Sequence, residues 1–136
     1  MDRRLYAVAN NTLAITGVSR NKNSSKQWLT FVSSDLSEII AEHKFSNLFY
    51  ADEHNAPAVI ALPQNQWLVA RTGHNDTFEN GQGSIEVTLF DQEYKPQNSY
   101  FLRTEYGSSY VQLVQANNKL YLLTRDTSNG WGVFIS

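Results

Sequence analysis

Short hydrophobic segments recur along the chain and alternate with turns rich in Asn, Gln, Pro, Ser and Gly. One pair of segments covers residues 58–62 and 67–72, and the loop Pro63-Gln64-Asn65-Gln66 lies between them. Apolar and β-branched runs of this length, bounded by turn residues, predict strands joined as a hairpin. Helix is scarce in this pattern. Its one candidate, residues 35–43, is short, and we interpret Leu36-Ser37 as a turn that leads into a strand.

The hairpins repeat. Leu5, Val59 and Leu113 are spaced 54 residues apart, and at this spacing the apolar positions of three hairpins align. The aligned sets are Tyr6, Ile60 and Val114; Leu13, Trp67 and Tyr121; and Ile15, Val69 and Leu123. We expect a third strand after each hairpin, at residues 27–33, 84–90 and 131–136, and a fourth at residues 39–45 and 99–103.

This pattern predicts an all-β fold made of repeat units. Four antiparallel strands per unit of about 50 residues is typical of a β-propeller blade. We place the units at residues 3–50, 57–103 and 110–136, the last one incomplete, which gives about 2.5 blades. Because closed propellers have more blades, we expect the chain to be part of a longer propeller and to self-associate through open blade edges.

Composition narrows the classes of function. The 136 residues carry a formal charge of -2, with 11 scattered basic residues, so we expect no nucleic-acid partner. The chain has no Cys, so it holds neither a disulfide nor a thiolate metal site. No apolar run approaches the roughly 18 residues that span a bilayer, and the first residues lack the apolar core of a signal peptide. We therefore expect no membrane partner.

Two His-Asn pairs flank the hairpin of residues 58–72. If its cross-strand partners sum to about 129, His54 lies opposite Asn75 and Asn55 lies opposite His74. Imidazoles serve in proton transfer near neutral pH and in metal ligation. A metal site is the weaker interpretation, because two His residues without Cys form an incomplete first shell. Each His also has an ordinary interpretation, as a solvated or loop-closing residue.

The last hairpin adds two candidates. With partner sums near 235, Tyr110 lies opposite Arg125, at the end equivalent to that of the two His residues. In a propeller, equivalent hairpin ends face one rim, so we expect these four side chains to converge there. The ordinary alternatives are a strand aromatic for Tyr110 and a surface ion pair with Asp126 or Glu105 for Arg125. We interpret His43 as a surface residue and the three Trp residues as packing residues, one of which could stack on a sugar ring if exposed.

The sequence from His54 to Pro63, followed by Trp67-Leu-Val-Ala-Arg-Thr-Gly-His-Asn75, resembles the BNR-type, sialidase-like propeller repeat of proteins related to seven-bladed ulvan lyases. The segment from Ser109 to Arg125 resembles the next segment of those lyases more loosely. The rest of the chain resembles the family only as propeller strands, so the resemblance covers only part of such an enzyme.

The resemblance implies β-elimination of a uronate-containing, ulvan-like polysaccharide, which would make the protein a carbon-oxygen lyase. By motif, His54, His74 and Tyr110 would serve as acid and base, and Arg125 would neutralise the uronate carboxylate. Asn55, Asn75 and Arg71 would bind the anionic polysaccharide. Whether His54 or Tyr110 is the base stays open, and Tyr106 is an alternative to Tyr110.

Two other classes of function remain as alternatives. A related propeller could act as a rhamnosidase-like or sialidase-like glycoside hydrolase, although the chain lacks the repeated Asp-box motif of sialidases. A non-catalytic propeller could bind glycans through its rim. The resemblance implies no cofactor and leaves a structural calcium or zinc ion open. It also implies that the whole protein is secreted or periplasmic, because long polysaccharides do not enter the cytoplasm.

Overall fold

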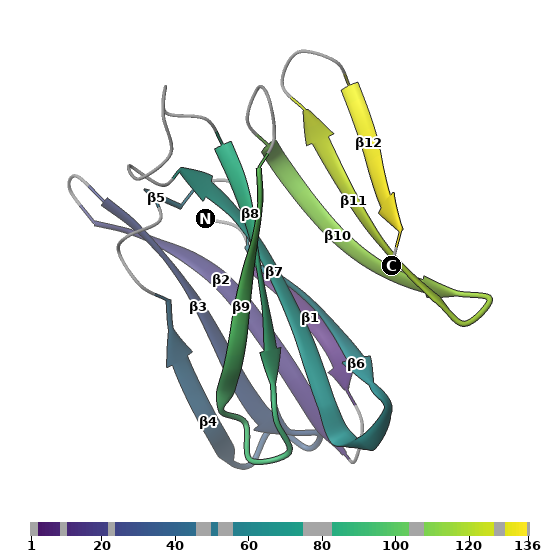
Figure 1. Cartoon of the computed structure of the whole chain (residues 1–136). Helices are drawn as coiled ribbons and strands as arrows, with labels where there is room; N and C mark the ends of the chain where they lie inside the picture. The colour runs from purple at the N-terminus through teal and green to yellow at the C-terminus, as the bar shows by residue number, and fades with distance from the viewer. Residues whose placement is uncertain are drawn as a thin grey trace.

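The chain folds into three antiparallel β-sheets in the computed structural model (Figure 1). The structure describes residues 3–8, 11–21, 24–45, 50–51, 56–74, 83–103, 108–126 and 130–135. It describes side chains for residues 3–6, 11–19, 26–45, 56–72, 85–102 and 111–124. Apart from one 3-10 turn at Pro63–Asn65, the regular structure of these residues is entirely β-strand, so the predicted all-β class is confirmed.

Each sheet is formed by strands that follow one another along the chain. Sheet 1 contains β1 (Arg3–Val8), β2 (Thr12–Asn21), β3 (Ser24–Ser33) and β4 (Ile39–Lys44) in that order. Sheet 2 has the order β5 (Tyr50–Ala51), β7 (Gln66–His74), β8 (Gly83–Phe90) and β9 (Pro96–Arg103), and β6 (Ala58–Leu62) also pairs with β7. Sheet 3 contains β10 (Ser108–Ala116), β11 (Lys119–Asp126) and β12 (Gly130–Ile135).

The repeat of four antiparallel strands is therefore present in the first two units. The region from Leu36 onward forms a turn followed by β4, as the sequence predicts, and not a helix. The turn between β3 and β4 is closed by Asp35, whose Oδ1 accepts a hydrogen bond from the backbone N of Ser37 at 3.0 Å. The turn between β8 and β9 uses Asp91 in the same way, accepting from the backbone N of Glu93 at 2.8 Å. These Asx turns explain why two polar stretches reverse the chain instead of starting helices.

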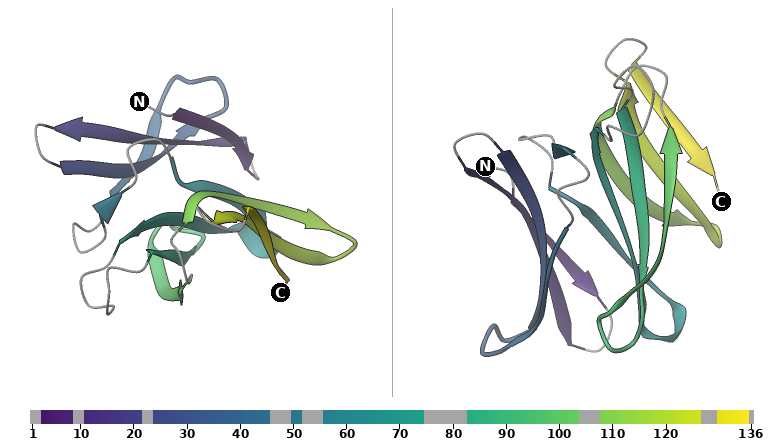
Figure 2. Two further views of the ribbon diagram at one scale, coloured as in Figure 1. Left: turned by 90° about the horizontal axis from the view of Figure 1, so that it is seen from above. Right: turned by 60° about the vertical axis from the view of Figure 1, so that its left-hand side comes forward.

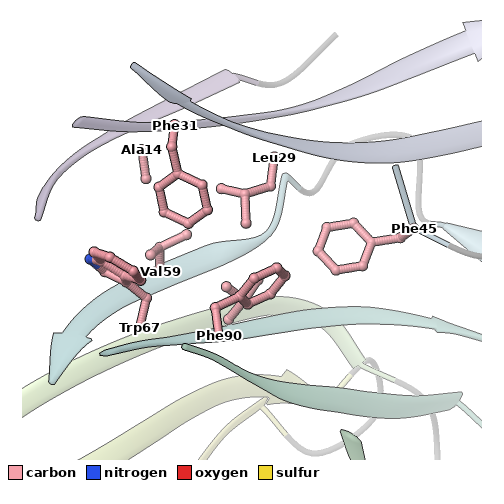
Figure 3. Close-up of a cluster of buried hydrophobic side chains, with 8 residues drawn as sticks. Ala14, Leu29, Phe31, Phe45, Val59, Trp67 and Phe90 are labelled. Atoms are coloured by element: carbon pink, nitrogen blue, oxygen red, sulfur yellow. The ribbon is translucent and has the colours of Figure 1, made fainter. Parts of the chain in front are cut away.

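Sheets 1 and 2 pack face to face around an aromatic core (Figure 3). Phe31 of β3 lies 5.2 Å from Trp67 of β7, measured between ring centroids, and 6.1 Å from Phe90 of β8. Trp67 also stacks on Tyr94, with centroids 4.7 Å apart. Complete burial of an aromatic or large aliphatic side chain contributes about 1.5–3 kcal/mol, so this cluster is a main source of cohesion between the two sheets.

A second core joins sheets 2 and 3. It is formed by residues that point to the other side of β6, β7 and β8, together with residues of β10 and β11. Its buried members are Ala58, Ala70, Ile85, Val111, Leu113 and Leu122. Successive residues of a strand point to opposite faces. Sheet 2 is thus covered on both faces, which accounts for the nearly continuous apolar sequence of β6.

The three sheets are stacked in one direction (Figure 2). In sheet 1, Tyr6 and Ala14 face sheet 2, and in sheet 2 the equivalent residues Ile60 and Leu68 face sheet 3. The first strands of the units lie together, since β6 contacts both β1 and β10. Equivalent positions of sheets 1 and 2 therefore face the next sheet of the stack, and the alternate positions of sheet 2 face the preceding sheet.

One detail of the predicted alignment is wrong. The 54-residue spacing holds for β10, but in β11 it falls to 53 residues, so that Leu122 and not Leu123 takes the place of Val69. The reason is turn length. The turn between β10 and β11 has two residues, Asn117 and Asn118, both at positive φ, whereas three residues separate β6 from β7. One residue fewer moves every β11 side chain to the opposite face.

Candidate functional site

The predicted rim corresponds to the open ends of the hairpins. The carboxyl ends of β7 and β11 and the amino end of β10 lie at the same upper end of the molecule in Figure 1. These strand ends carry His74, Arg125 and Tyr110, respectively. The structure thus brings the backbone of three predicted site residues to one end of the sheets. His54, Asn55 and Asn75 lie outside the described residues.

Tyr110 and Arg125 are direct cross-strand partners, which confirms the predicted register of the last hairpin. A β-bulge precedes the pair, because Ser108 lies opposite Asp126 and the extra residue Ser109 is inserted before Tyr110. Bulges locally increase strand twist and turn a side chain away from its regular direction, and they are frequent beside binding sites. The pair therefore lies where the regular ladder of this hairpin ends.

The predicted register of the middle hairpin is wrong by one residue. Partners in β6 and β7 sum to 128, as in the pair Ala58 and Ala70, and not to 129. At the end of β7, His74 pairs with Tyr50 of β5 instead of with Asn55. The short strand β5 replaces β6 as the neighbour of β7 there, so a simple two-strand extrapolation fails.

Arg71 is buried between sheets 1 and 2 and is only 2% exposed. Its Nε donates to Oε1 of Glu86 on β8 at 2.7 Å, and its Nη1 donates to Oε1 of Gln27 on β3 at 3.3 Å. The guanidinium carbon lies 4.6 Å above the ring of Phe45, which is a cation–π contact. The Arg71 side chain is thus engaged inside the sheet stack and is not presented at the rim.

The electrostatics of Arg71 follow from this position. Burial lowers the pKa of the guanidinium, while the hydrogen bond and the negative charge of Glu86 raise it. An arginine keeps its proton under such conditions, so the buried ion pair persists. Gln27 extends the network, because its Nε2 donates to the backbone oxygen of Thr72 at 3.4 Å and its backbone oxygen accepts from Phe45 N at 3.2 Å. This network fixes the relative position of sheets 1 and 2.

His43 is not the surface residue that the sequence predicts. It is half-buried on the face of β4 that points to sheet 2, with its ring 4.7 Å from that of Phe45 and 5.2 Å from that of Phe90. Burial lowers the pKa of His43, and the charge of Arg71 lowers it further, whereas Glu86 raises it. Strand alternation with the exposed Glu42 and Lys44 is the signal that could have revealed its inward direction.

Arg4 links the first strand of unit 1 to the first strand of unit 3. Its Nη1 donates to the backbone oxygen of Val111 at 2.9 Å and to Oε1 of Gln112 at 3.4 Å. A hydrogen bond between a charged donor and a buried backbone acceptor is among the stronger polar contacts in proteins. It joins two sheets that are separated by sheet 2 along the stack, so the first strands of all three units converge.

Other chemistry is sparse in the described part of the chain. It contains no group of three or more His, Cys, Asp or Glu residues that could hold a metal ion. Within the same residues, no helix has the length and apolar character needed to cross a membrane. A shallow hollow of about 280 Å³ lies at Trp28, Thr30, Glu42 and Lys44 of sheet 1, next to Leu29 and His43. The hollow lies on sheet 1 and contains none of the predicted site residues.

Comparisons with known proteins give no assignment. Searches of protein-family models, curated proteins and solved structures return no significant match to the chain.

Proposed function

We propose that this chain forms part of a β-propeller whose rim, at the open ends of the hairpins, binds an anionic polysaccharide and cleaves it by β-elimination next to a uronate. The propeller proposal is supported by stacked four-stranded units in which each sheet offers the same kind of face to the next. The site proposal is supported by the direct pairing of Tyr110 with Arg125 beside a bulge.

The chemistry needs three groups. A cation neutralises the uronate carboxylate, which makes the proton on C5 acidic, and a guanidinium suits this role because it binds a carboxylate with two hydrogen bonds. A base removes the C5 proton, the bond between C4 and O4 breaks, a double bond forms between C4 and C5, and an acid protonates O4. We assign the first role to Arg125 and the proton transfers to Tyr110, His74 and His54.

The observation that carries this proposal is the cross-strand pair. A phenol and a guanidinium on directly opposite residues have Cβ atoms about 4.5–5.5 Å apart. That spacing allows one residue to bind a carboxylate while its neighbour reaches the adjacent carbon of the same sugar. Asn55 and Asn75 complete the proposed binding surface, whereas Arg71 belongs to the buried network.

The test is ultraviolet absorbance during incubation with an ulvan-type polysaccharide, because elimination creates a conjugated, unsaturated uronate and hydrolysis does not. We expect rising absorbance with the unaltered protein and a decrease in rate of about 10²-fold or more for Arg125→Ala and for His74→Ala. Lys119→Ala is the matched control, since it removes a cation from the other end of β11 and leaves the rim intact.

Three results would contradict the proposal. Release of reducing sugar without absorbance would indicate a glycoside hydrolase. Binding of the polymer without any cleavage would indicate a non-catalytic glycan-binding propeller. Equal rates for Arg125→Ala and Lys119→Ala would show that the assigned arginine has no special role.

A further inference from the structure

The two outer sheets of the stack each have one face without a neighbouring sheet among the described residues. We call the outer side of sheet 1, with Leu5, Leu13, Ile15, Gly17 and Trp28, the open face of sheet 1. We call the outer side of sheet 3, with Val114, Tyr121 and Leu123, the open face of sheet 3. Alternation defines both sets, because their neighbours Tyr6, Ala14, Val111, Leu113 and Leu122 point into the two cores.

The open face of sheet 1 has the composition of a buried surface. Leu5 is 63% exposed, whereas its equivalent in sheet 2, Val59, is 3% exposed because sheet 1 covers it. Leu13 and Ile15 are equivalent to Trp67 and Val69, each of which is 1% exposed. At these repeat positions both sheets carry apolar side chains. They are buried in sheet 2, whereas no neighbouring sheet among the described residues covers them in sheet 1. Exposed apolar surface of this kind marks an interaction site.

Trp28 shapes this face. It pairs directly with Gly17, and its indole lies against the glycine so closely that an added Cβ would overlap Cζ2 of the indole. Trp28 Nε1 donates to Oγ of Ser19 at 3.1 Å, which holds the ring along the sheet. The hollow of about 280 Å³ beside it is bordered by Thr30, Glu42 and Lys44. A flat aromatic surface next to a hollow suits side chains that protrude from an opposing sheet.

The open face of sheet 3 is formed by the positions that face the next sheet in sheets 1 and 2. Val114 and Tyr121 are equivalent to Tyr6 and Ala14 of sheet 1 and to Ile60 and Leu68 of sheet 2, which all face the next sheet in the stack. Val114 is 39% exposed and has no such neighbour within the described residues. The open face of sheet 3 can thus pack on an open face of sheet 1 with the same geometry as the two existing interfaces.

We propose that two copies of this chain associate head to tail, each packing its open face of sheet 3 on the open face of sheet 1 of the other. Such a contact is heterologous, and a heterologous contact must either close a ring or continue as a filament. Two copies contribute six sheets, within the range of about 4–8 blades at which propellers close. This proposal rests on the sheet stack and is independent of the proposed lyase activity.

The first test is the molar mass of the 136-residue chain in solution, measured by light scattering during size-exclusion chromatography over a dilution series. We expect twice the chain mass of 15.5 kDa, with dissociation on dilution. A monomer at every concentration would overturn the proposal. Filaments that lengthen with concentration would also overturn it, because they would show that the contact does not close.

Two variants test which faces are used. Leu5→Glu places a carboxylate on the open face of sheet 1, and Val114→Glu does the same on sheet 3. Both residues are exposed in the single chain, so we expect both variants to keep the β-sheet circular dichroism spectrum and to weaken dimerisation by at least about tenfold. Leu36→Glu is the matched control, because Leu36 is 67% exposed in the turn between β3 and β4 and lies on neither face.

Mixing the two variants separates head-to-tail packing from symmetric packing. An equimolar mixture retains one intact contact, between sheet 3 of Leu5→Glu and sheet 1 of Val114→Glu, so we expect a weak mixed dimer that neither variant forms alone. If Leu5→Glu abolished the dimer and Val114→Glu did not, two sheet 1 faces would pack on each other and the proposal would be wrong. Equal disruption by Leu36→Glu would likewise overturn it. The dilution series of the unaltered chain decides the case without any variant.

Discussion

Arg71 and His43 both contact the ring of Phe45, and their surroundings decide what each can do. Arg71 has a glutamate, a glutamine and an aromatic face as partners inside the stack. His43 has two aromatic rings and a nearby guanidinium, which together disfavour its charged form. A sequence pattern can place both residues on a strand, but their burial depends on contacts between sheets far apart in the chain. For this reason the sequence predicted Arg71 as a ligand-binding residue and His43 as a surface residue.

His43 makes the stability of the fold depend on pH. Its pKa is lowered from 6.5 in the folded state, so the unfolded chain binds the proton more tightly. The free energy of unfolding therefore falls as the pH drops through 6.5 and levels off below the folded pKa. We expect lower midpoints of urea unfolding at about pH 5 than at about pH 7.5.

His43→Gln is the control for this pH effect, because it retains a polar side chain of similar size without a titrating group. We expect the variant to lose the part of the pH dependence that lies just below 6.5. Arg71 and Glu86 are the charged groups that act on the pKa of His43, the first lowering it and the second raising it. An unchanged pH dependence in the variant would show that another group is responsible.

The length of each turn decides which face of the sheet the side chains of the next strand occupy. The existence, order and pairing of the strands follow from alternation and turn residues, and the sequence predicted them well. The cross-strand register was predicted less well than the order of the strands. The last hairpin was predicted correctly, whereas the middle hairpin was off by one residue and β5 was missed as a partner of β7. A two-residue strand with no apolar periodicity leaves no signal that alternation can detect.

The two-residue turn of β10 and β11 offers a direct test of its backbone conformation. Asn117 and Asn118 have φ values of 52° and 61°, a region that Asn and Gly tolerate better than other residues. We expect Asn118→Ala to lower the free energy of unfolding by about 1 kcal/mol and Asn118→Gly to leave it equal or slightly higher. The measurement is urea unfolding, and Gln115→Ala, in the regular part of β10, is the matched control. A neutral Asn118→Ala would contradict a left-handed conformation at this turn.

The three sheets form a stack that has a direction, because the same strand positions face the next sheet in sheet 1 and in sheet 2. The repeat in the sequence predicted units of this kind, because every unit carries apolar residues on both faces of its strands. The predicted rim residues had no such pattern to support them, since polar residues at strand ends carry no periodic signal. Arg4 adds a contact that no pattern indicates, a hydrogen bond from β1 to the backbone of β10.

We propose that a uronate binds where the carboxyl ends of β7 and β11 lie beside the amino end of β10. The most direct measurement is an amide NMR titration of the chain with a glucuronate-containing oligosaccharide and with its carboxyl-reduced counterpart. We predict saturable shifts at His74, Tyr110 and Arg125 with the uronate, and much weaker shifts with the reduced sugar. Shifts confined to Trp28 and its neighbours, or equal responses to both sugars, would contradict the assigned rim site.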